Sequence, residues 1–522
     1  MLKVTLLCSL VCAFSVCAVY HGLSGLTSSG AERNFMLYYN KPLRQDVYAM
    51  NGMQKMQRVI FREYDIRGEV GSDVLIDQMY DLGRAIAYFF KQKRPEIKTV
   101  ALGMDGRTHS PLIKKEIERA CLDSGLNVVF VGLCSSPALY FSLYTKPYDA
   151  GIMITASHNP KEYNGIKLCL GKASIYGHDV QEIYELYAAG AHIKGATPGT
   201  YQEEMIIPSY VDWLADHFAH LKHMPLKAVV DCGNGAGATV LPLLVEKMGW
   251  QDVQLLYATV DGNYPNHEAD PTKIENMEEV KAVLRNSDAA VGVGLDGDAD
   301  RMAAMTKEGI LVPGDLLLGL FARQIAGQSA QRAVVFDIKS SKALADMLQS
   351  VDMVPVMAPS GHAIVKNKMR ETDAVLGGEL SCHFFFNDTY FGFDDGVYAM
   401  LRLFDLLLKE QRSLDELLAM YPVLHSSIEY RIACPEHKKQ LIVQTVKDLF
   451  LQKEGAEVIT IDGVRVTTPY GWALLRASNT QPMLSMRFEA ESKEGLERMK
   501  EEMIAALALF YAPQELRDQL QD

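Results

Sequence analysis

The alternation of apolar and polar segments predicts the same three-part unit at three places along the chain. In each unit a short apolar run is followed by a polar loop and then by a segment with helical periodicity. The apolar runs are residues 99–103, 226–231 and 333–337, and the helices after them are expected at 110–123, ending at Met248 and ending at Gln349. This repetition predicts three related α/β domains, each with a parallel or mixed sheet covered by helices.

The C-terminal part of the chain has a different pattern. Strands are expected at 464–468, 472–475 and 483–488, followed by an amphipathic helix over 493–510. Strands with a closing helix predict an α+β module. The pattern therefore divides the chain into an N-terminal extension and four domains, with the limits 1–55, 56–202, 203–309, 310–422 and 423–522.

The N-terminal extension admits three interpretations. Residues 4–19 are apolar apart from Thr and Ser, and this run is shorter than the roughly 20 residues that span a bilayer. A secretory signal, a membrane anchor, and translated upstream sequence before a true start near Met53 or Met56 all fit such a run. We favour the third, because domain-like sequence begins only at residues 59–61.

Composition and charge limit the classes of function that this chain can have. The chain has 522 residues, of which 48% are hydrophobic and 22% charged, as in globular proteins. Its formal charge of −13 argues against nucleic acid as a partner, which requires a basic face. The nine cysteines are scattered without metal-ligand spacing, which indicates reduced thiols. We therefore expect a cytoplasmic location and no stable membrane association of the catalytic body.

The first chemically distinctive loop is TASHNP at 155–160, directly after the apolar run 150–154. Pro160 ends regular structure because it lacks an N–H and has a fixed φ. Ser157 is thus expected at the mouth of a strand, where parallel sheets place their functional side chains. A plain turn is the alternative interpretation, since Ser, Asn and Pro are all turn residues.

The second loop carries alternate carboxylates. Asp296, Asp298 and Asp300 follow the apolar run 289–295, with small residues between them. Three oxygen ligands at this spacing can converge on a hard cation such as Mg²⁺, with a phosphoryl oxygen as a further ligand. An EF-hand is excluded, because Arg301 and a lysine replace its required Gly and Glu. A solvated acidic turn is the other alternative.

Two further loops offer binding groups for a sugar phosphate. Glu379 and Ser381 lie two residues apart after paired glycines, so in an extended loop they point the same way and could hold neighbouring sugar hydroxyls. An ordinary hairpin explains this loop equally well. The loop at 476–482 presents a guanidinium, hydroxyls, an amide and free backbone N–H groups, which suits a phosphate. Its alternative is a connector with capping residues.

Taken in order, the motifs TASHNP, DGDADR, GELS-x-H and RASNTQP resemble those of the α-D-phosphohexomutase superfamily. The opening FREYDIRG at 61–68 is similar to the start of its phosphomannomutase/phosphoglucomutase branch. This resemblance implies four domains around a central active-site cleft, with one loop from each domain. It also implies interconversion of hexose 1-phosphates and 6-phosphates, of mannose or glucose or both, through a phosphoserine. Mg²⁺ would be the cofactor and a hexose 1,6-bisphosphate the intermediate and activator, and the protein would be a monomer or homodimer.

The resemblance also implies residue roles. Ser157 would be the phosphoserine and, with Asp296, Asp298 and Asp300, would bind the metal. Substrate would be bound by sugar-hydroxyl, phosphate and further contacts: Glu379 and Ser381; Arg476, Ser478, Asn479 and Thr480; Tyr64, Lys339 and His362. The remaining active-site groups would be Arg67, His158, Lys167, Arg301 and His383. Lys167 and His383 are the candidate general bases, and Lys167 would need burial or the neighbouring Arg67 to lower its pKa. His158 is expected to position the serine.

Two other functions remain as alternatives. Phosphoglucosamine mutases share TASHNP, but there the opening resembles F-G-T-D-G-x-R-G and Gln usually stands where this chain has Leu380. A non-catalytic paralogue is disfavoured by the intact serine and carboxylates. One position departs from the family pattern, because Cys382 stands where Gly is usual. We expect the loop to keep its shape, and the thiol to be open to oxidation if it is exposed and His383 lowers its pKa.

Overall fold

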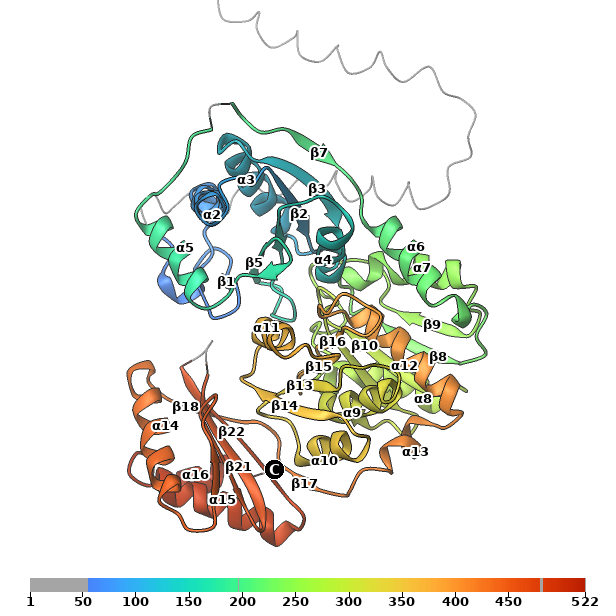
Figure 1. Cartoon of the computed structure of the whole chain (residues 1–522), viewed down its shortest axis with the longest axis vertical. Coiled ribbons are helices and arrows are strands. Elements are labelled where there is room, and N and C mark those ends of the chain that lie inside the picture. The colour runs from blue at the N-terminus through green and yellow to red at the C-terminus, as the bar shows by residue number, and fades with distance from the viewer. Residues whose placement is uncertain (1–54, 196, 479–481, 522) are drawn as a thin grey trace, which may run out of the picture. The chain divides into compact units, whose positions relative to one another are not determined.

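The computed structural model describes residues 55–195, 197–478 and 482–521. The N-terminal extension up to residue 54, together with Asn479 and Thr480 of the predicted phosphate loop, lies outside the described residues. The described chain forms four sheets with flanking helices (Figure 1). In this described part no helix is both long and apolar enough to cross a membrane.

The first sheet is mixed and has the order β1-β5-β4-β2-β3-β7, with β6 paired to β5. Strands β2, β3, β4 and β7 run parallel, whereas β5 is antiparallel to β4 and β1. The elements are β1 (Ile66–Glu69), β2 (Thr99–Met104), β3 (Asn127–Leu133), β4 (Ala150–Ile154), β5 (Tyr163–Leu170), β6 (Ala173–Ser174), β7 (Tyr201–Glu203), α2 (Met79–Lys93), α3 (Ser110–Asp123), α4 (Ser136–Thr145) and α5 (His178–Ala188).

The second and third sheets repeat the mixed design. Their orders are β12-β11-β10-β8-β9 and β14-β13-β15-β16. The second unit contains α6 (Ile207–His217), β8 (Ala228–Asp231), α7 (Leu241–Met248), β9 (Val253–Leu256), α8 (Glu278–Asn286), β10 (Val291–Leu295), β11 (Met302–Thr306) and β12 (Leu311–Val312). The third contains α9 (Gly314–Ile325), β13 (Ala333–Asp337), α10 (Lys342–Ser350), β14 (Val354–Ala358), α11 (His362–Thr372), β15 (Leu376–Gly378), β16 (Phe384–Phe386), α12 (Gly396–Glu410) and α13 (Leu414–Leu418).

The fourth sheet is antiparallel, with the order β17-β22-β21-β20-β19 and β18 paired to β22. Its elements are β17 (His425–Ser426), β18 (Tyr430–Ala433), α14 (Glu436–Leu451), β19 (Glu457–Ile459), β20 (Val464–Thr468), β21 (Gly471–Ala477), β22 (Met483–Ala490), α15 (Lys493–Leu507) and α16 (Pro513–Gln519). The predicted class, three α/β domains and a C-terminal α+β domain, is confirmed.

The predicted strand–loop–helix units are formed because local sequence favours each turn from strand to helix. Helix α3 has the limits expected from its periodicity, and a proline in its first turn places the missing N–H where no partner is needed. Helix α4 also begins with a proline, and its N-cap Ser135 accepts a hydrogen bond from the Ala138 N–H. Strand β12 pairs with β11 of the second sheet, although it lies beyond the expected limit at residue 309.

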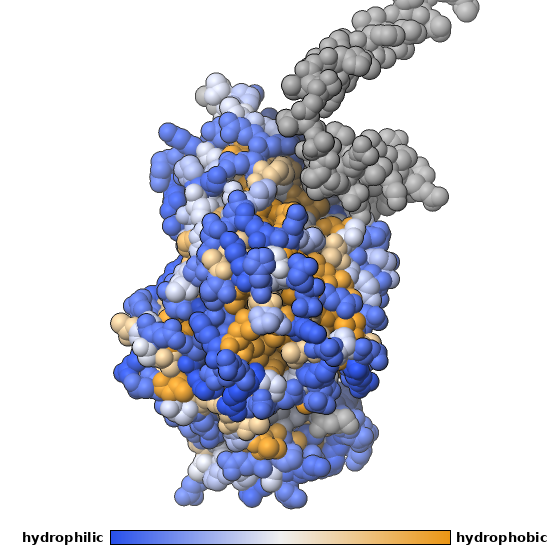
Figure 2. Space-filling model, turned by 90° about the vertical axis from the view of Figure 1, so that its right-hand side faces the viewer, coloured by the Kyte–Doolittle hydropathy of each residue, from blue (hydrophilic) through white to orange (hydrophobic). Residues whose placement is uncertain are grey.

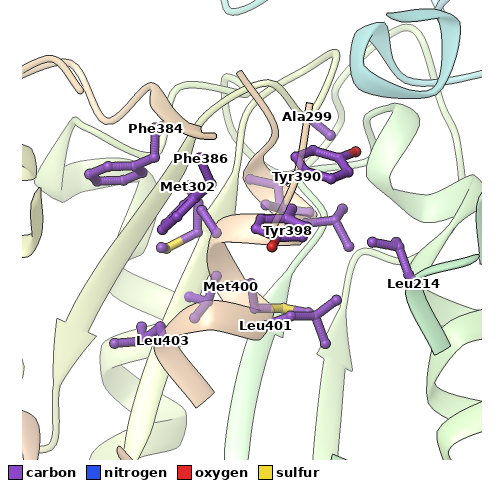
Figure 3. Packing of buried hydrophobic residues seen from close by; sticks show 14 of the residues in the cluster. Leu214, Ala299, Met302, Phe384, Phe386, Tyr390, Tyr398, Met400, Leu401 and Leu403 are labelled. Atoms are coloured by element: carbon purple, nitrogen blue, oxygen red, sulfur yellow. The ribbon is translucent and has the colours of Figure 1, made fainter. Parts of the chain in front are cut away.

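A large hydrophobic core joins the first three units, with contributions from α4, α6 and α12. Figure 3 shows the rings of Tyr390 and Tyr398 lying over each other, with their centroids 4.0 Å apart. Asp395 caps α12 by accepting the Tyr398 N–H at 2.9 Å, and it also accepts hydrogen bonds from the hydroxyls of Tyr210 and Tyr390. The core therefore fixes the loop before α12 against a helix from the second unit.

The fourth unit has its own core and contacts the third through a buried arginine. The Arg465 guanidinium lies 3.7 Å from the centre of the Trp472 ring and donates to the carbonyls of Ile338 and Ser340 at 2.5 and 2.7 Å. The indole N–H of Trp472 in turn donates to Glu489 at 2.7 Å. Figure 2 shows one face of the molecule as largely hydrophilic, with apolar surface confined to patches.

Shortening a side chain in the shared core tests its importance. Phe404 on α12 is fully buried and packs edge-on against Trp250 of the second unit, with ring centroids 5.8 Å apart. Phe404→Ala should lower the free energy of unfolding by about 3–5 kcal/mol, as measured by urea denaturation. Leu509→Ala is the control, because Leu509 is 74% exposed and its loss should change stability by less than about 0.5 kcal/mol. Equal effects of the two substitutions would contradict a shared core.

Candidate active site

Ser157 lies in a strained turn just beyond the carboxyl end of β4. Its φ is 51°, a left-handed value that is uncommon for a residue with a Cβ and marks a turn held by its surroundings. Its N–H donates to the Thr155 hydroxyl at 2.8 Å. Its own hydroxyl is buried and donates to Asp296 Oδ2 at 2.8 Å, with His158 Nδ1 3.2 Å away. The Ser157 hydroxyl therefore has defined, buried partners, which a plain surface turn would not provide.

The acidic loop after β10 is buried, which excludes a solvated turn. Asp296, Asp298 and Asp300 are 0% exposed, and one ligand oxygen from each lies within 4.8 Å of the others. Like-charged carboxylates at this spacing repel one another unless cations face them. Lys167 supplies one such cation, since its Nζ donates to Asp298 at 2.7 Å and to Asp300 at 2.5 Å.

These carboxylates fit the Mg²⁺ that the sequence predicts. All three offer oxygen, the ligand type that Mg²⁺ prefers. Asp298 Oδ1 is buried without a hydrogen-bond partner, although the other oxygen of this carboxylate accepts from Ser136 and Lys167. Burial and then the charge of Asp300 raise the pKa of Asp296 to about 7, so the cluster holds more negative charge than its surroundings favour. A divalent cation would give Asp298 Oδ1 a partner and would offset the negative charge of the cluster.

The cations of the site are held in charged form by the same carboxylates. Burial alone would lower the pKa of Lys167, but Asp298 and Asp300 outweigh it and raise that pKa. The lowered pKa that would suit Lys167 as a base is therefore absent from this arrangement. Burial likewise opposes the charge on His383, and Asp300 with Glu379 outweighs it and raises its pKa to about 10. The pKa of His158 is lowered, chiefly by burial and then by Arg301.

Arg301 joins the acidic loop to two other segments. Its Nε donates to Asp296 at 2.9 Å, and its Nη1 lies 3.3 Å from Asp270. Its backbone forms a β-bridge with His383 of the hairpin between β15 and β16. Nη2 of Arg301 is buried and has no hydrogen-bond partner among the described residues, so it is available to an anion. Asp270 was missed by the sequence analysis, because nothing in its local pattern links it to residue 301.

The predicted sugar-binding residues converge on one imidazole. Glu379 Oε2 and the Ser381 hydroxyl each lie 3.3 Å from Nδ1 of His383, so the two side chains do point the same way. The β15–β16 hairpin also forms, which makes the hairpin and the clamp compatible. His362 stacks on His383 with ring centroids 5.5 Å apart. Tyr64 donates its hydroxyl to the Ser360 carbonyl in the segment between β14 and α11, just before His362.

Residues of the opening motif lie beside the serine loop. Arg67 Nη1 donates to the Asn159 side chain at 2.8 Å, and Arg67 also pairs with Asp65. The register of β1 against β5 places Arg67 opposite Gly165, next to the strand that carries Lys167. Arg67 thus lies on the strand that pairs with the strand carrying Lys167.

The predicted phosphate loop lies at the end of β21. Arg476 Nη2 pairs with Asp462 at 2.8 Å, and Asp462 also accepts the Ser360 N–H at 3.2 Å. Lys339 lies 3.8 Å from Asp337. Burial opposes the charge on Lys339, but Glu429 and Asp337 outweigh it and raise its pKa. Ser478 closes the strand pair by donating its N–H to the Met483 carbonyl at 3.0 Å.

Comparison with known proteins adds independent evidence. Four models described as phosphoglucomutase/phosphomannomutase match successive parts of the chain: alpha/beta/alpha domain I at 58–194, domain II at 208–309, domain III at 313–424 and the C-terminal domain at 429–506. The chain belongs to the phosphoglucomutase/phosphomannomutase family. The resemblance inferred from the four loop motifs is thereby confirmed.

Individual members of the family match over nearly their whole length. A phosphoglucomutase from Neisseria gonorrhoeae is 38% identical over 87% of this chain and 98% of its own. A phosphomannomutase/phosphoglucomutase from Pseudomonas aeruginosa is 37% identical over 84% and 94%. A solved structure of a phosphoglucomutase/phosphomannomutase family protein from Burkholderia thailandensis is 33% identical, covers 87% of this chain and 98% of its own, and superposes with a TM-score of 0.80.

Cys382, which stands where the family usually has glycine, corrects one expectation. Its φ is 68°, so the loop keeps the left-handed conformation that glycine favours and accepts a Cβ there. The thiol is not exposed, because only 3% of the residue is accessible to solvent. Its pKa is not lowered by His383 but is raised to about 12, chiefly by burial. Neither condition set for oxidation, exposure or a lowered pKa, is met in the folded site.

Arg107 is the main site residue that the sequence analysis missed. Its guanidinium is fully buried and donates to four backbone carbonyls around the serine: Ser157 at 2.7 Å, Asn159 at 2.6 Å, Pro160 at 2.7 Å and Tyr163 at 3.0 Å. Its Nε lies 3.2 Å from Asp105. The available signal was its place after β2, which runs parallel to β4, so that both strands end at the same edge of the sheet.

Thiol labelling tests the corrected view of Cys382. A buried thiol with a raised pKa presents little thiolate, which is the reactive form. Iodoacetamide should therefore alkylate Cys382 at least about a hundredfold more slowly in the native protein than in urea, as measured by peptide mass spectrometry. The unfolded chain is the control for intrinsic reactivity. Similar rates in the two states would show that the loop is open.

Proposed function

We propose that this protein is a phosphohexomutase that interconverts the 1-phosphate and 6-phosphate of glucose, of mannose, or of both. The observation that carries the proposal is the Ser157 hydroxyl, which is buried at 2.8 Å from Asp296 inside a cluster of three carboxylates. Family membership supports it, since the relatives that match over most of the chain are named phosphoglucomutase or phosphomannomutase.

The reaction would transfer a phosphoryl group twice. Phosphorylated Ser157 gives its phosphoryl group to the free hydroxyl of a hexose monophosphate, so that the serine P–O bond breaks and a sugar P–O bond forms. The product, a hexose 1,6-bisphosphate, turns end over end and returns its other phosphoryl group to Ser157. The same bisphosphate from solution activates any enzyme whose serine has lost its phosphate.

The charged groups around Ser157 have separate parts in this proposal. Asp296, Asp298, Asp300 and an oxygen of the phosphoserine would hold Mg²⁺, which when bound neutralises charge on the transferring phosphoryl oxygens. Arg301, with its unpaired buried Nη2, would contact the same phosphoryl group. His158 lies 3.2 Å from the hydroxyl and, with its lowered pKa, would position the serine as a neutral group.

The sugar hydroxyl must lose a proton as it attacks, and Lys167 and His383 are the proposed acceptors. In the arrangement described here the pKa values of both groups are raised. One of them must therefore release its proton before it acts as a base. Both contact Asp300, so the charge balance of the acidic loop controls which group is free to do so.

Substrate would be held at both ends of the sugar. Glu379 and Ser381 would bind two hydroxyls, and Arg476 would exchange Asp462 for the phosphate that does not react. The other proposed contacts are Ser478, Asn479 and Thr480 for that phosphate, and Tyr64, Arg67, Lys339 and His362 for the rest of the substrate. Because these phosphate-binding residues would lie at a constant distance from the serine, the sugar could bind in either orientation.

The alternative functions have less support. The solved N-acetylglucosamine-phosphate mutases are 14–15% identical with TM-scores of 0.52–0.56, a likeness of fold alone. A non-catalytic paralogue has no need of a buried serine hydrogen-bonded to a carboxylate cluster. The domain limits, the cytoplasmic location and the monomeric or dimeric state stay predictions.

Replacing the nucleophile tests the proposal directly. Ser157→Ala should abolish turnover of glucose 1-phosphate and mannose 1-phosphate with Mg²⁺ and a trace of glucose 1,6-bisphosphate, because the phosphoryl carrier is gone. Binding of the sugar phosphates, measured by calorimetry, should persist because the residues proposed to bind the sugar and its phosphate are unchanged. Ser350→Ala, at the exposed end of α10, is the matched control. Normal turnover by Ser157→Ala would remove this residue from the mechanism.

A second substitution tests the metal site. Asp298→Asn keeps the shape of the side chain but removes one negative charge, so it should weaken Mg²⁺ binding and lower turnover by about 10²-fold. Calorimetric Mg²⁺ titration and turnover against Mg²⁺ concentration measure the two effects. Asp288→Asn is the control, since the Asp288 side chain is 85% exposed. Wild-type activity of Asp298→Asn at low Mg²⁺ would show that the loop is purely structural.

A further inference from the structure

The buried guanidinium of Arg107 binds the backbone of the serine loop. The five N–H groups of Arg107 face four carbonyls of residues 157–163 and the carboxylate of Asp105. Pro160 has no N–H to donate, so it interrupts regular backbone hydrogen bonding in this loop. Carbonyls without partners are costly when they are buried. The Pro160 carbonyl also accepts the Tyr163 N–H at 3.0 Å, and Arg107 supplies a side-chain donor to each of the four carbonyls.

We infer that Arg107 is a positioning residue, which holds the phosphorylated serine at a fixed place relative to the metal-binding loop. This inference rests on the proposed function. Arg107 donates directly to the carbonyl of Ser157, whose left-handed φ of 51° requires support from its surroundings. Gly297 of the acidic loop also packs against that carbonyl, because a Cβ at Gly297 would overlap the Ser157 oxygen. The carbonyl therefore contacts both the guanidinium and the metal loop.

Arg107 is itself anchored in both units that meet at the serine. In the first unit Asp105 accepts hydrogen bonds from the backbone N–H of Arg107 at 3.1 Å and from the Ser110 hydroxyl at 2.7 Å. In the second unit the Tyr264 ring lies 5.2 Å from the guanidinium. Close backbone packing locks the two units together here, because a Cβ on Gly262 would overlap the backbone at Gly106. A shift of Arg107 would therefore move Ser157 relative to Asp296.

Only arginine has the geometry for this contact. Its planar fork presents five donors in fixed directions, whereas the ammonium of lysine is a single point with three rotating donors. A lysine would keep the charge opposite Asp105 but leave carbonyls of the loop unsatisfied. Among the described residues, the contacts of Arg107 include none of those proposed to bind the sugar or its distal phosphate. Its loss should therefore act on transfer and leave substrate binding in place.

The test compares Arg107→Lys and Arg107→Ala with wild type. In both variants kcat should fall by about 10²-fold, the scale expected when a reacting group is misplaced by about 1 Å, while KM stays within about threefold. Guanidinium chloride below denaturing concentration should restore part of kcat in Arg107→Ala, and equal NaCl should not. Arg119→Ala on α3 is the control, because that side chain is 57% exposed and lies against Glu116 and the Tyr80 ring, away from the serine loop; its kinetics should match wild type.

A second measurement keeps the inference testable apart from activity. Hydrogen–deuterium exchange in Arg107→Lys should speed up in residues 155–163 and stay unchanged in the β20–β21 region of the fourth unit. Wild-type kcat in both variants, or a rise in KM alone, would overturn the positioning role, as would unchanged exchange in 155–163. If wild type itself lacks mutase activity, the proposed function fails, and the exchange experiment still decides whether Arg107 holds the loop.

Discussion

Three carboxylates buried together are the constraint on which the rest of this site depends. Desolvation and mutual repulsion disfavour the charged forms of Asp296, Asp298 and Asp300, and the fold compensates by placing cations against them. Lys167 reaches the cluster from β5 and Arg301 from the end of the acidic loop itself. Each cation has its charge stabilised in return, which explains why deep burial does not make the lysine neutral. The site is a balanced set of charges that binding of a divalent ion or a phosphate must rearrange.

Satisfying backbone groups is the second constraint. The serine loop departs from regular structure where the Ser157 hydroxyl meets the acidic loop, and carbonyls of the serine loop accept hydrogen bonds from Arg107. The same principle recurs where the third and fourth units meet, because Arg465 donates hydrogen bonds to the carbonyls of Ile338 and Ser340. In both places a buried arginine holds a functional loop, and its planar fork makes the loop geometry specific. Rigid scaffolds thus position loops that carry no regular structure of their own.

Much of the fold and part of the site could be predicted from local pattern alone. Strands β4, β13 and β20 occupy the predicted residues, because a continuous apolar run between polar loops has few alternatives in a buried sheet. The order of the four motifs identified the family for the same reason, since each motif is a short contiguous segment. The sequence left an ordinary hairpin and a sugar clamp of Glu379 and Ser381 as alternatives; the structure shows that the hairpin forms and that both side chains lie beside His383.

What the sequence determined by itself is the set of chemical groups and their spacing: a serine beside a histidine, alternate carboxylates, and an arginine at the end of a strand. Tertiary structure decided which groups face one another. Arg107 meets carbonyls fifty residues away because β2 and β4 end at one sheet edge, and no local pattern encodes that pairing. It also decided protonation, since a pKa depends on burial and on neighbours brought from other units. Cys382 shows this most simply: its sequence neighbour His383 suggested a reactive thiol, and packing made it a buried one.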